Sequence, residues 1–268
     1  MVEHIDIDKV LRTRVPRYRK WMPRFVVRWL ERLVHQDELN AVLDHIGERH
    51  GVEAAKAIIE HLDITLDVRG KENLPDGGRY LFVSNHPLGG LDGIALIAGI
   101  GAHYGGEIRF LVNDLLMAVK PLSDVFLPVN KYGRQKREAV EAIETEYAGN
   151  RQMLSFPAGL CSRRLDDGSI GDLPWQKNVV VMATRHRRDI VPIRFDAVNS
   201  KRFYRIARLR ERLGIKFNFE MILLPAEVFK KRGQTLHIVV GKPIDFSTLD
   251  TRHPLDEAAR LRKLVYEL

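Results

Sequence analysis

Hydrophobic and polar residues alternate with two different periods along the chain, and the change between them falls within residues 63–70. Before it, apolar residues recur at three- and four-residue steps and no glycine precedes Gly47, a pattern that predicts helices. After it, short β-like runs are separated by glycine or proline turns and by polar stretches long enough for helices. The runs are ITLDV, YLFVSN, IRFLV, VFLPV, RQMLSF, DIVPIRF and LHIVV.

Strands that alternate with helix-length segments are typical of the α/β class. We therefore expect a largely parallel or mixed sheet flanked by helices and preceded by an N-terminal helical region. The expected division places an amphipathic, membrane-contacting helical region in residues 1–65 and the α/β domain in residues 66–268.

Residues 18–34 combine a wide apolar stripe with basic borders. Glu31 is the only acidic residue from Leu11 to Leu33. Aromatic rings flanked by arginines are typical of a helix that lies in the headgroup plane of a membrane. The alternative is that the stripe packs on the α/β domain while the arginines are solvated, and this explains the pattern equally well. The two explanations can apply to different residues of the stripe. Pro23 predicts that the regular part of this helix begins near it. The stripe comprises Tyr18, Trp21, Met22, Phe25, Val26, Trp29, Leu30, Leu33 and Val34, and its borders Arg12, Arg14, Arg17, Arg19, Lys20, Arg24, Arg28 and Arg32.

The overall composition is that of a globular protein drawn to anions. Of 268 residues, 45% are hydrophobic and 29% charged, with a formal net charge of +8. Such a charge favours a membrane, a nucleic acid or an acidic carrier protein as partner. A single cysteine, Cys161, fits a reducing compartment, and no secretory signal or membrane-spanning run is recognisable. We expect a protein peripheral to the cytoplasmic face of a membrane.

The segment from Ser84 to Gly93 carries the candidate chemistry, because it links a predicted strand to an apolar helix. Ligands of parallel α/β sheets bind at the carboxyl ends of strands. His86 lies there and can accept and return a proton near neutral pH. Asp92 follows a Gly-Gly pair and can hold the other ring nitrogen. The alternative is a loop histidine beside a helix N-cap aspartate.

The motif Asn85-His86 with Asp92-Gly93 resembles the first signature of the glycerolipid (lysophosphatidate-type) acyltransferases. Similar blocks follow in that family's order between about residues 70 and 245, which makes chance agreement improbable. They are Phe126-Leu127-Pro128-Val129-Asn130-Lys131, Phe156-Pro157-Ala158-Gly159 with Ser162-Arg163, Val191-Pro192-Ile193, and Gly241-Lys242-Pro243-Ile244.

The resemblance implies transfer of a fatty acyl chain from acyl carrier protein or coenzyme A thioester to a hydroxyl or amine of a lipid precursor. It implies no metal, no tightly bound cofactor and no covalent acyl-enzyme. His86 is the expected general base, oriented by Asp92. The expected substrate-binding residues are Asn85, Asn130, Lys131, Arg134, Phe156, Pro157, Gly159 and Arg163.

Two of these expectations concern anionic groups on the substrates. Lys131, Arg134, Arg163 and Arg164 are candidate anchors for an acceptor carboxylate or phosphate, with surface solvation as the alternative. The backbone N–H of Gly159 is a candidate oxyanion contact, with a simple tight turn as the alternative.

The sequence also departs from the family pattern. Five residues separate His86 from Asp92, one more than is usual, and a bulged loop beside two glycines can absorb the extra residue. In the block that begins at Phe156, Ala158 and Cys161 stand where the family usually has glutamate and arginine. In the block that begins at Phe126, Asn130-Lys131 stands where the family commonly has an acidic residue followed by arginine. These changes suggest an unusual acceptor, such as the lyso-form of an amino-acid lipid, beside a glycerophospholipid precursor.

Other chemistries find less support. Cys161 has no recognisable histidine partner and no nucleophile-elbow motif. The spacing of the remaining histidines predicts no metal site. No nucleic-acid-binding motif accompanies the basic residues, so no nucleic-acid partner is expected; a basic nucleic-acid-binding protein is kept as an alternative because it would explain the charge. A catalytically inactive membrane-binding protein of the same fold stays an alternative.

Overall fold

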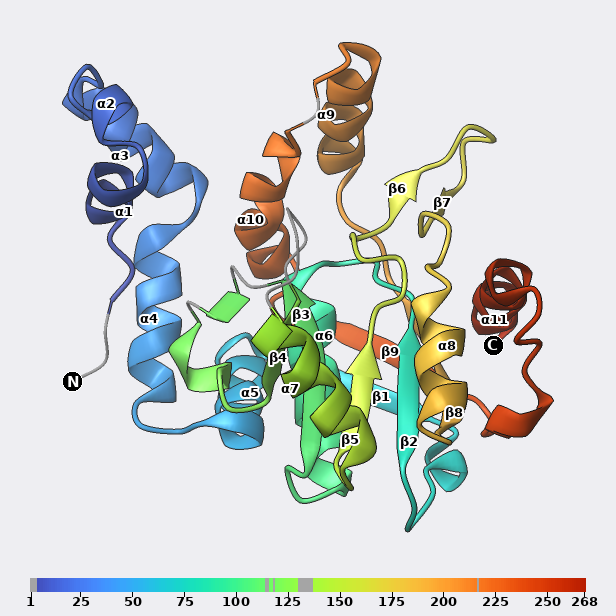
Figure 1. The fold of residues 1–268 in the computed structure, drawn as a ribbon. Helices are drawn as coiled ribbons and strands as arrows, with labels where there is room; N and C mark the ends of the chain where they lie inside the picture. The colour runs from blue at the N-terminus through green and yellow to red at the C-terminus, as the bar shows by residue number, and fades with distance from the viewer. Residues whose placement is uncertain (1–3, 114–115, 118, 130–136, 216) are drawn as a thin grey trace.

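The structure is a computed structural model that describes residues 4–113, 116–117, 119–129, 137–215 and 217–268. Its centre is a seven-stranded sheet in the order β1-β9-β8-β2-β5-β3-β4 (Figure 1). The strands are β1 (Thr65–Arg69), β2 (Tyr80–Ser84), β3 (Ile108–Asn113), β4 (Phe126–Val129), β5 (Gln152–Ser155), β8 (Asp189–Asp196) and β9 (Thr235–Val240). The expectation of an α/β fold with a largely parallel or mixed sheet is confirmed.

Strand pairing in the sheet is parallel except between β8 and β9. Each of the seven runs chosen from the sequence forms one of these strands. The sequence did not reveal the antiparallel β8–β9 pair or the two-stranded hairpin of β6 (Arg163–Arg164) and β7 (Ile170–Gly171). Pairing direction depends on partners distant in the chain, which hydrophobic periodicity does not report.

Helices cover both faces of the sheet, and side chains of β2 show the alternation that this requires. Phe82 packs into the cluster that contains α4, α5 and α6, whereas Leu81 and Val83 pack on α7, α8 and α11. A strand buried on both faces needs apolar residues at successive positions, as β2 has. These helices are α4 (Gln36–Ile46), α5 (Gly51–His61), α6 (Gly90–Leu96), α7 (Arg137–Ala148), α8 (Asn178–Arg185) and α11 (Pro254–Glu267).

The remaining elements lie at the ends of the sheet or on its edges. The α-helices among them are α1 (Ile7–Arg14), α2 (Pro16–Arg19), α3 (Arg24–Leu33), α9 (Lys201–Arg212) and α10 (Leu224–Phe229). The π-helical turn η2 (Ile97–Gly101) extends α6. The 3-10 turns are η1 (Lys71–Asn73), η4 (Lys120–Leu122), η5 (Phe219–Leu223) and η6 (Phe246–Thr248).

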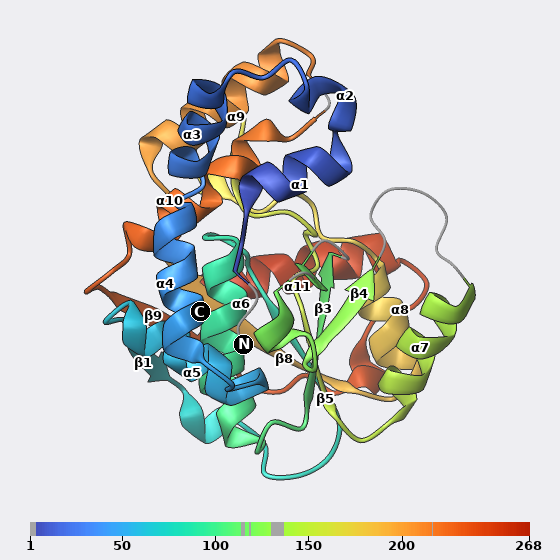
Figure 2. The same cartoon turned by 90° about the vertical axis from the view of Figure 1, so that its left-hand side faces the viewer.

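The N-terminal helices divide into two groups. Ala54, Ala55 and Ile58 of α5 are buried in the main core, so α5 belongs to the packing of the α/β domain. In contrast, α1, α2 and α3 extend beyond one end of the sheet (Figures 1 and 2). The start of α3 directly after Pro23 confirms the expectation drawn from that proline.

In the described part of the chain, every helix is too short or too polar to cross a bilayer.

Candidate active site

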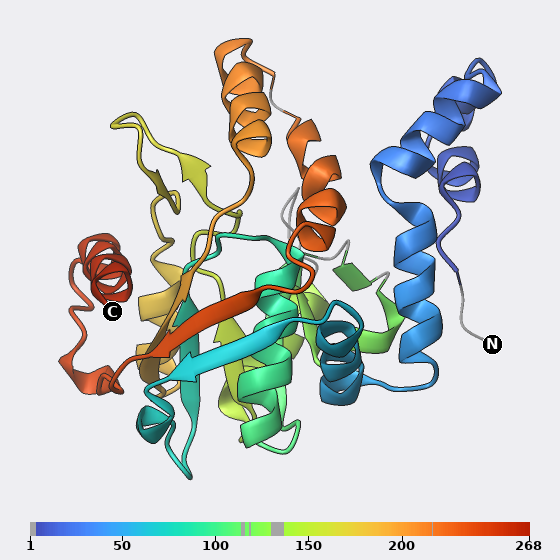
Figure 3. The same ribbon diagram turned by 180° about the vertical axis from the view of Figure 1, so that it is seen from behind.

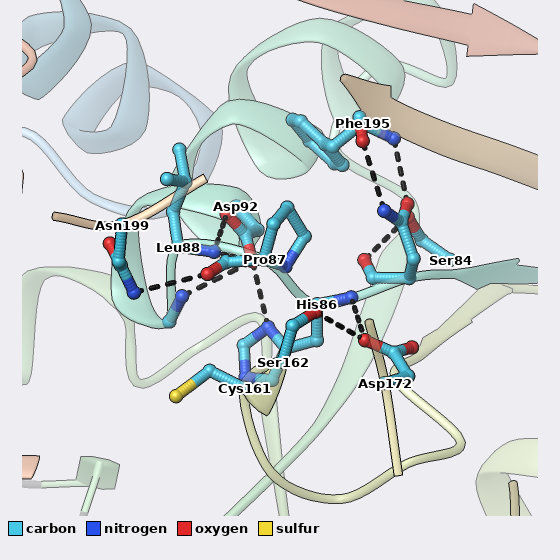
Figure 4. Close-up of polar contacts among 12 residues, drawn as sticks. Ser84, His86, Pro87, Leu88, Asp92, Cys161, Ser162, Asp172, Phe195 and Asn199 are labelled. Atoms are coloured by element: carbon cyan, nitrogen blue, oxygen red, sulfur yellow. Dashed lines mark hydrogen bonds and ion pairs between the residues drawn. The ribbon is translucent and has the colours of Figure 1, made fainter. Parts of the chain in front are cut away.

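His86 follows β2 by two residues, at the carboxyl end of a central strand of the sheet (Figures 1 and 4). Its Nδ1 atom lies 2.9 Å from Oδ2 of Asp92, close enough for a hydrogen bond. Gly89 adopts a φ of +84°, a left-handed conformation that glycine enters without strain. This turn accommodates the additional residue between His86 and Asp92, so the two side chains meet despite the longer spacing.

Asp92 is fully buried at the start of α6 and accepts hydrogen bonds besides the one from His86. The backbone N–H of Leu88 donates to its carboxylate at 2.9 Å and that of Gly89 at 3.2 Å. Burial raises the pKa of Asp92, while the hydrogen bonds from His86, Leu88 and Gly89 oppose that rise. Since an ionised carboxylate only accepts hydrogen bonds, its contact with His86 fixes the ring proton on Nδ1.

The imidazole ring lies between packed protein and solvent. It stacks on the ring of Phe156, with centroids 3.9 Å apart and an interplanar angle of 16°. The His86 side chain is 16% exposed. Among the described residues, none forms a hydrogen bond with Nε2, so this atom can accept a proton.

Asp172 holds the backbone of His86 and was not foreseen from the sequence. Its Oδ1 atom accepts from the His86 backbone N–H at 3.1 Å and from the Ser162 hydroxyl at 2.7 Å. The Ser162 backbone N–H donates in turn to the His86 carbonyl at 2.7 Å (Figure 4). The indole N–H of Trp175 donates to Oδ2 of Asp172 at 2.9 Å. No local motif marks this residue, because the backbone that it holds, at His86, is 86 residues away in the chain.

Comparison with known proteins supports the chemistry that this geometry allows. A model of the family described as acyltransferase matches residues 9–268. This chain belongs to the acyltransferase family. As the resemblance predicted, it is an acyltransferase enzyme.

Two relatives are each 44% identical to this acyltransferase over 265 residues, which is 98% of its chain. Both are named lyso-glycine lipid O-acyltransferase. One comes from Bacteroides thetaiotaomicron and is covered over 97% of its length, and the other from Phocaeicola vulgatus, over 95%. A solved structure, the 1-acyl-sn-glycerophosphate (LPA) acyltransferase PlsC from Thermotoga maritima, matches with a TM-score of 0.46 at 15% identity. That match covers 91% of this chain and 92% of PlsC.

Three residues expected to bind substrate have structural partners in the acyltransferase, and their substrate-binding roles stay predictions. The buried amide of Asn85 bonds both backbone groups of Phe195, at 2.9 and 2.7 Å, and thereby joins the loop to β8. Pro157 is buried and its carbonyl accepts from Gln176. The N–H of Gly159 donates to the Phe156 carbonyl at 2.9 Å, in the tight turn that was the alternative reading. That N–H is therefore not a free oxyanion donor.

Arg163 also has structural partners. It is buried, its Nη2 atom lies 2.8 Å from Oε1 of Glu220, and Nη1 donates to the Cys161 carbonyl at 2.9 Å. Its guanidinium is thus occupied by internal partners, and its role as an acceptor anchor stays a prediction. Arg164, next to it, is exposed.

Phe156 stacks on the ring of His86, and its substrate-binding role stays a prediction. Asn130, Lys131 and Arg134 lie outside the described residues. Cys161 is fully buried and burial raises the pKa of its thiol, which disfavours the thiolate that a nucleophile needs. In the described ranges, no group of three or more histidine, cysteine or acidic side chains is placed to hold a metal ion.

Proposed function

We propose that this acyltransferase works at a membrane surface and moves a fatty acyl chain from an acyl thioester to a hydroxyl of a lyso-glycine lipid. The observation that carries the proposal is the His86–Asp92 pair, with Nδ1 held at 2.9 Å and Nε2 left to meet a substrate. The donor is an acyl carrier protein or coenzyme A thioester.

The reaction requires one proton to move twice. Nε2 of His86 takes the proton of the acceptor hydroxyl as its oxygen attacks the thioester carbonyl carbon. The carbon–sulfur bond then breaks, and the imidazolium returns the proton to the departing thiolate. Acyl transfer is complete without a covalent enzyme intermediate, which agrees with the burial of Cys161.

Asp92 contributes by stabilising the imidazolium that forms during attack. The carboxylate holds the Nδ1 proton, so that the lone pair of Nε2 faces outward from the pair. Asp172 and Ser162 fix the backbone of His86 from two directions, at 3.1 and 2.7 Å. A rigid base keeps its distance from the acceptor, which is a condition for efficient proton transfer.

The acceptor is inferred from two independent features. The block that begins at Phe156 lacks the glutamate and arginine that are usual in the family, since Ala158 and Cys161 occupy those positions and both are buried. Relatives that are 44% identical along nearly the whole chain carry the name lyso-glycine lipid O-acyltransferase. Both features favour a glycine-containing acceptor over lysophosphatidate, and an oxygen over an amine as the acylated atom.

Membrane association is supported by the surface of α2 and α3. The stripe foreseen from the sequence is divided in the structure, because Val34 is buried and Leu33 packs against a buried cluster, whereas Trp21 is 88% and Phe25 72% exposed. Arginines surround the exposed rings on α3, where they can meet lipid phosphates. Large exposed aromatic side chains in a basic setting fit the headgroup region of a bilayer.

The acceptor can be tested with purified enzyme supplied with acyl carrier protein or coenzyme A thioesters. We expect acylation of lyso-glycine lipid and little or none of lysophosphatidate, measured by mass spectrometry of the products. Exclusive use of lysophosphatidate would remove the proposed acceptor while leaving acyl transfer in place.

The base can be tested with His86→Ala. We expect a fall in kcat of at least about 10³-fold, since this change removes both the base and its imidazolium. His237→Ala is the matched control, because His237 pairs with Asp67 at 2.8 Å on the surface, and its rate should stay within about twofold of the parent. A folded His86→Ala enzyme with parental activity would exclude the proposed base and would show that the His86–Asp92 pair has no catalytic role.

A further inference from the structure

A second group of exposed apolar side chains lies on α9 and the segment that follows it, far in sequence from α2 and α3. Phe217 is 75% and Leu213 63% exposed. Large apolar patches on a protein surface mark contacts with partners or membranes. The further exposed members are Leu209, Ile215, Phe219 and Ile222.

The exposure of these residues follows from how α9 is oriented. Phe203, Ala207 and Arg210 recur at steps of four and three residues and form its buried face. Leu209 and Leu213, four residues apart, therefore lie on the outer face. Their outward position is fixed by the fold, because a helix cannot bury both faces against one core.

Arginines accompany these apolar residues. A surface cleft of about 490 Å³ lies between α9 and the β6–β7 hairpin. Its cationic lining consists of Arg164, Arg205, Arg208 and Arg212, and Asp166 and Asp167 also line it. Guanidinium groups next to exposed leucines suit phosphate-bearing headgroups next to acyl chains.

Buried charges hold this segment in place. Glu220 in η5 is fully buried, with Nη2 of Arg163 2.8 Å from Oε1 and Nε of Arg210 3.0 Å from Oε2. Phe217 and Phe219 lie three residues and one residue before Glu220 in the sequence, so the buried carboxylate anchors the segment that carries them. Arg163 is adjacent to Ser162, whose backbone N–H bonds the carbonyl of His86. The surface is connected in this way to the loop that holds the catalytic base.

The location of the segment agrees with a membrane role. In three views of the molecule, α9 projects from the same end as α2 and α3 (Figures 1, 2 and 3). That end is also where β2 leads into the His86 loop. A flat bilayer can therefore contact both groups of exposed side chains at once.

We propose that the outer face of α9 and the segment through η5 form a second lipid-contacting surface, which binds an anionic bilayer together with α2 and α3. The proposal rests on the membrane location given under the proposed function. The second surface would place the bilayer next to the end of the α/β domain that carries the His86 loop.

Site-specific labels test this without disturbing the fold. Cys161 is the only cysteine in the sequence and is fully buried, so a cysteine introduced at an exposed position takes up a fluorophore selectively. An environment-sensitive label on Phe217→Cys should shift to shorter wavelength with vesicles of equimolar phosphatidylglycerol and phosphatidylcholine, as should one on Phe25→Cys. Leu255→Cys is the matched control, because Leu255 is 62% exposed on α11 and should show no shift.

Binding measurements supply a second arm. Leu213→Ser with Phe217→Ser should weaken co-sedimentation with these vesicles by about tenfold or more, since two large side chains no longer enter the lipid. Arg205→Gln with Arg212→Gln should weaken it at low salt and much less at high salt. Leu255→Ser should leave binding unchanged.

The outcomes separate this inference from the proposed function. A shift at position 25 alone, or unchanged binding of the Leu213 and Phe217 variant, would overturn the second surface. A shift at 217 with an acidic acyl carrier protein and none with vesicles would also overturn it. Acyl transfer to detergent-dispersed lyso-glycine lipid is measured in parallel, and its absence would count against the proposed function instead.

Discussion

Two clusters of buried charged side chains adjoin the short segment from Cys161 to Arg163, through the bond of Ser162 to His86 and through Arg163 itself. They differ in how much of each cluster reaches solvent. In the pair of His86 and Asp92, the carboxylate is fully buried but the ring reaches solvent and keeps Nε2 for a substrate. In the cluster of Arg163, Glu220 and Arg210, all three side chains are buried and face one another.

The difference shows that one fold can use one buried carboxylate to orient a solvent-facing base and another to hold structural elements together. A buried charge is costly unless it is paired, and both clusters satisfy that condition. Only the first retains a titratable atom at the surface, at the carboxyl end of a strand where ligands bind in α/β folds. The second uses its charges to join β6, α9 and η5, and thereby supports the loop beside the catalytic ring.

Removing the charge of Asp92 should give the largest effect on activity. We expect Asp92→Asn to lower kcat by about 10³- to 10⁴-fold, because the amide does not hold the Nδ1 proton or stabilise the imidazolium. Asp67→Asn is the matched control, since Asp67 bonds His237 at 2.8 Å away from the site, and its kcat should be parental. An active Asp92→Asn enzyme would show that the pair is structural only.

The same substitution predicts a direction for stability against pH. Burial raises the pKa of Asp92 in the folded state, so ionisation of this group costs folding free energy. The stability of the parent should therefore fall relative to Asp92→Asn as pH rises through that raised pKa, and the difference should level off below the unfolded-state pKa of about 3.9. Urea unfolding at a series of pH values measures it; a difference that changes in the opposite direction would contradict the assignment.

Breaking the cluster of Arg163, Glu220 and Arg210 should lower the free energy of unfolding. We expect Glu220→Gln to lower the free energy of unfolding by about 3–5 kcal/mol, because Arg163 and Arg210 lose their shared buried carboxylate. Glu53→Gln is the matched control, since the exposed pair of Glu53 and Lys56 should contribute about 1 kcal/mol or less. Equal losses in the two variants, measured by denaturant unfolding, would remove the structural role given to the cluster.

A smaller effect is expected at Asp172, which bonds the His86 backbone and the Ser162 hydroxyl. Asp172→Asn should lower kcat by about tenfold, because the backbone of His86 loses part of its support while the imidazole keeps Asp92. The pH dependence of kcat should keep its parental midpoint, since Asp172 does not bond the ring. Trp175→Phe, which removes only the bond to Oδ2, should change kcat less; a shifted midpoint in Asp172→Asn would instead place Asp172 in the proton transfer.

The fold class could be predicted from local patterns because strands buried on two faces require continuous apolar runs. The seven runs that became strands, and the start of α3 after Pro23, follow from this and from backbone sterics. His86 and Asp92 could also be paired from the sequence, since both belong to one short loop with glycines that let it turn back. Here short-range chemistry and the final structure agree.

The roles of Asn85, Arg163 and Asp172 could not be predicted, because their partners are Phe195, Glu220 and the His86 backbone, all distant in sequence. A motif gives the identity of a polar side chain but not whether its groups face substrate or other parts of the chain. The sequence by itself determined the fold class and the pairing of His86 with Asp92. Only the tertiary structure decided which charged residues are sealed inside and which apolar ones, such as Trp21 and Phe217, are left outside, since burial depends on every element that packs around a residue.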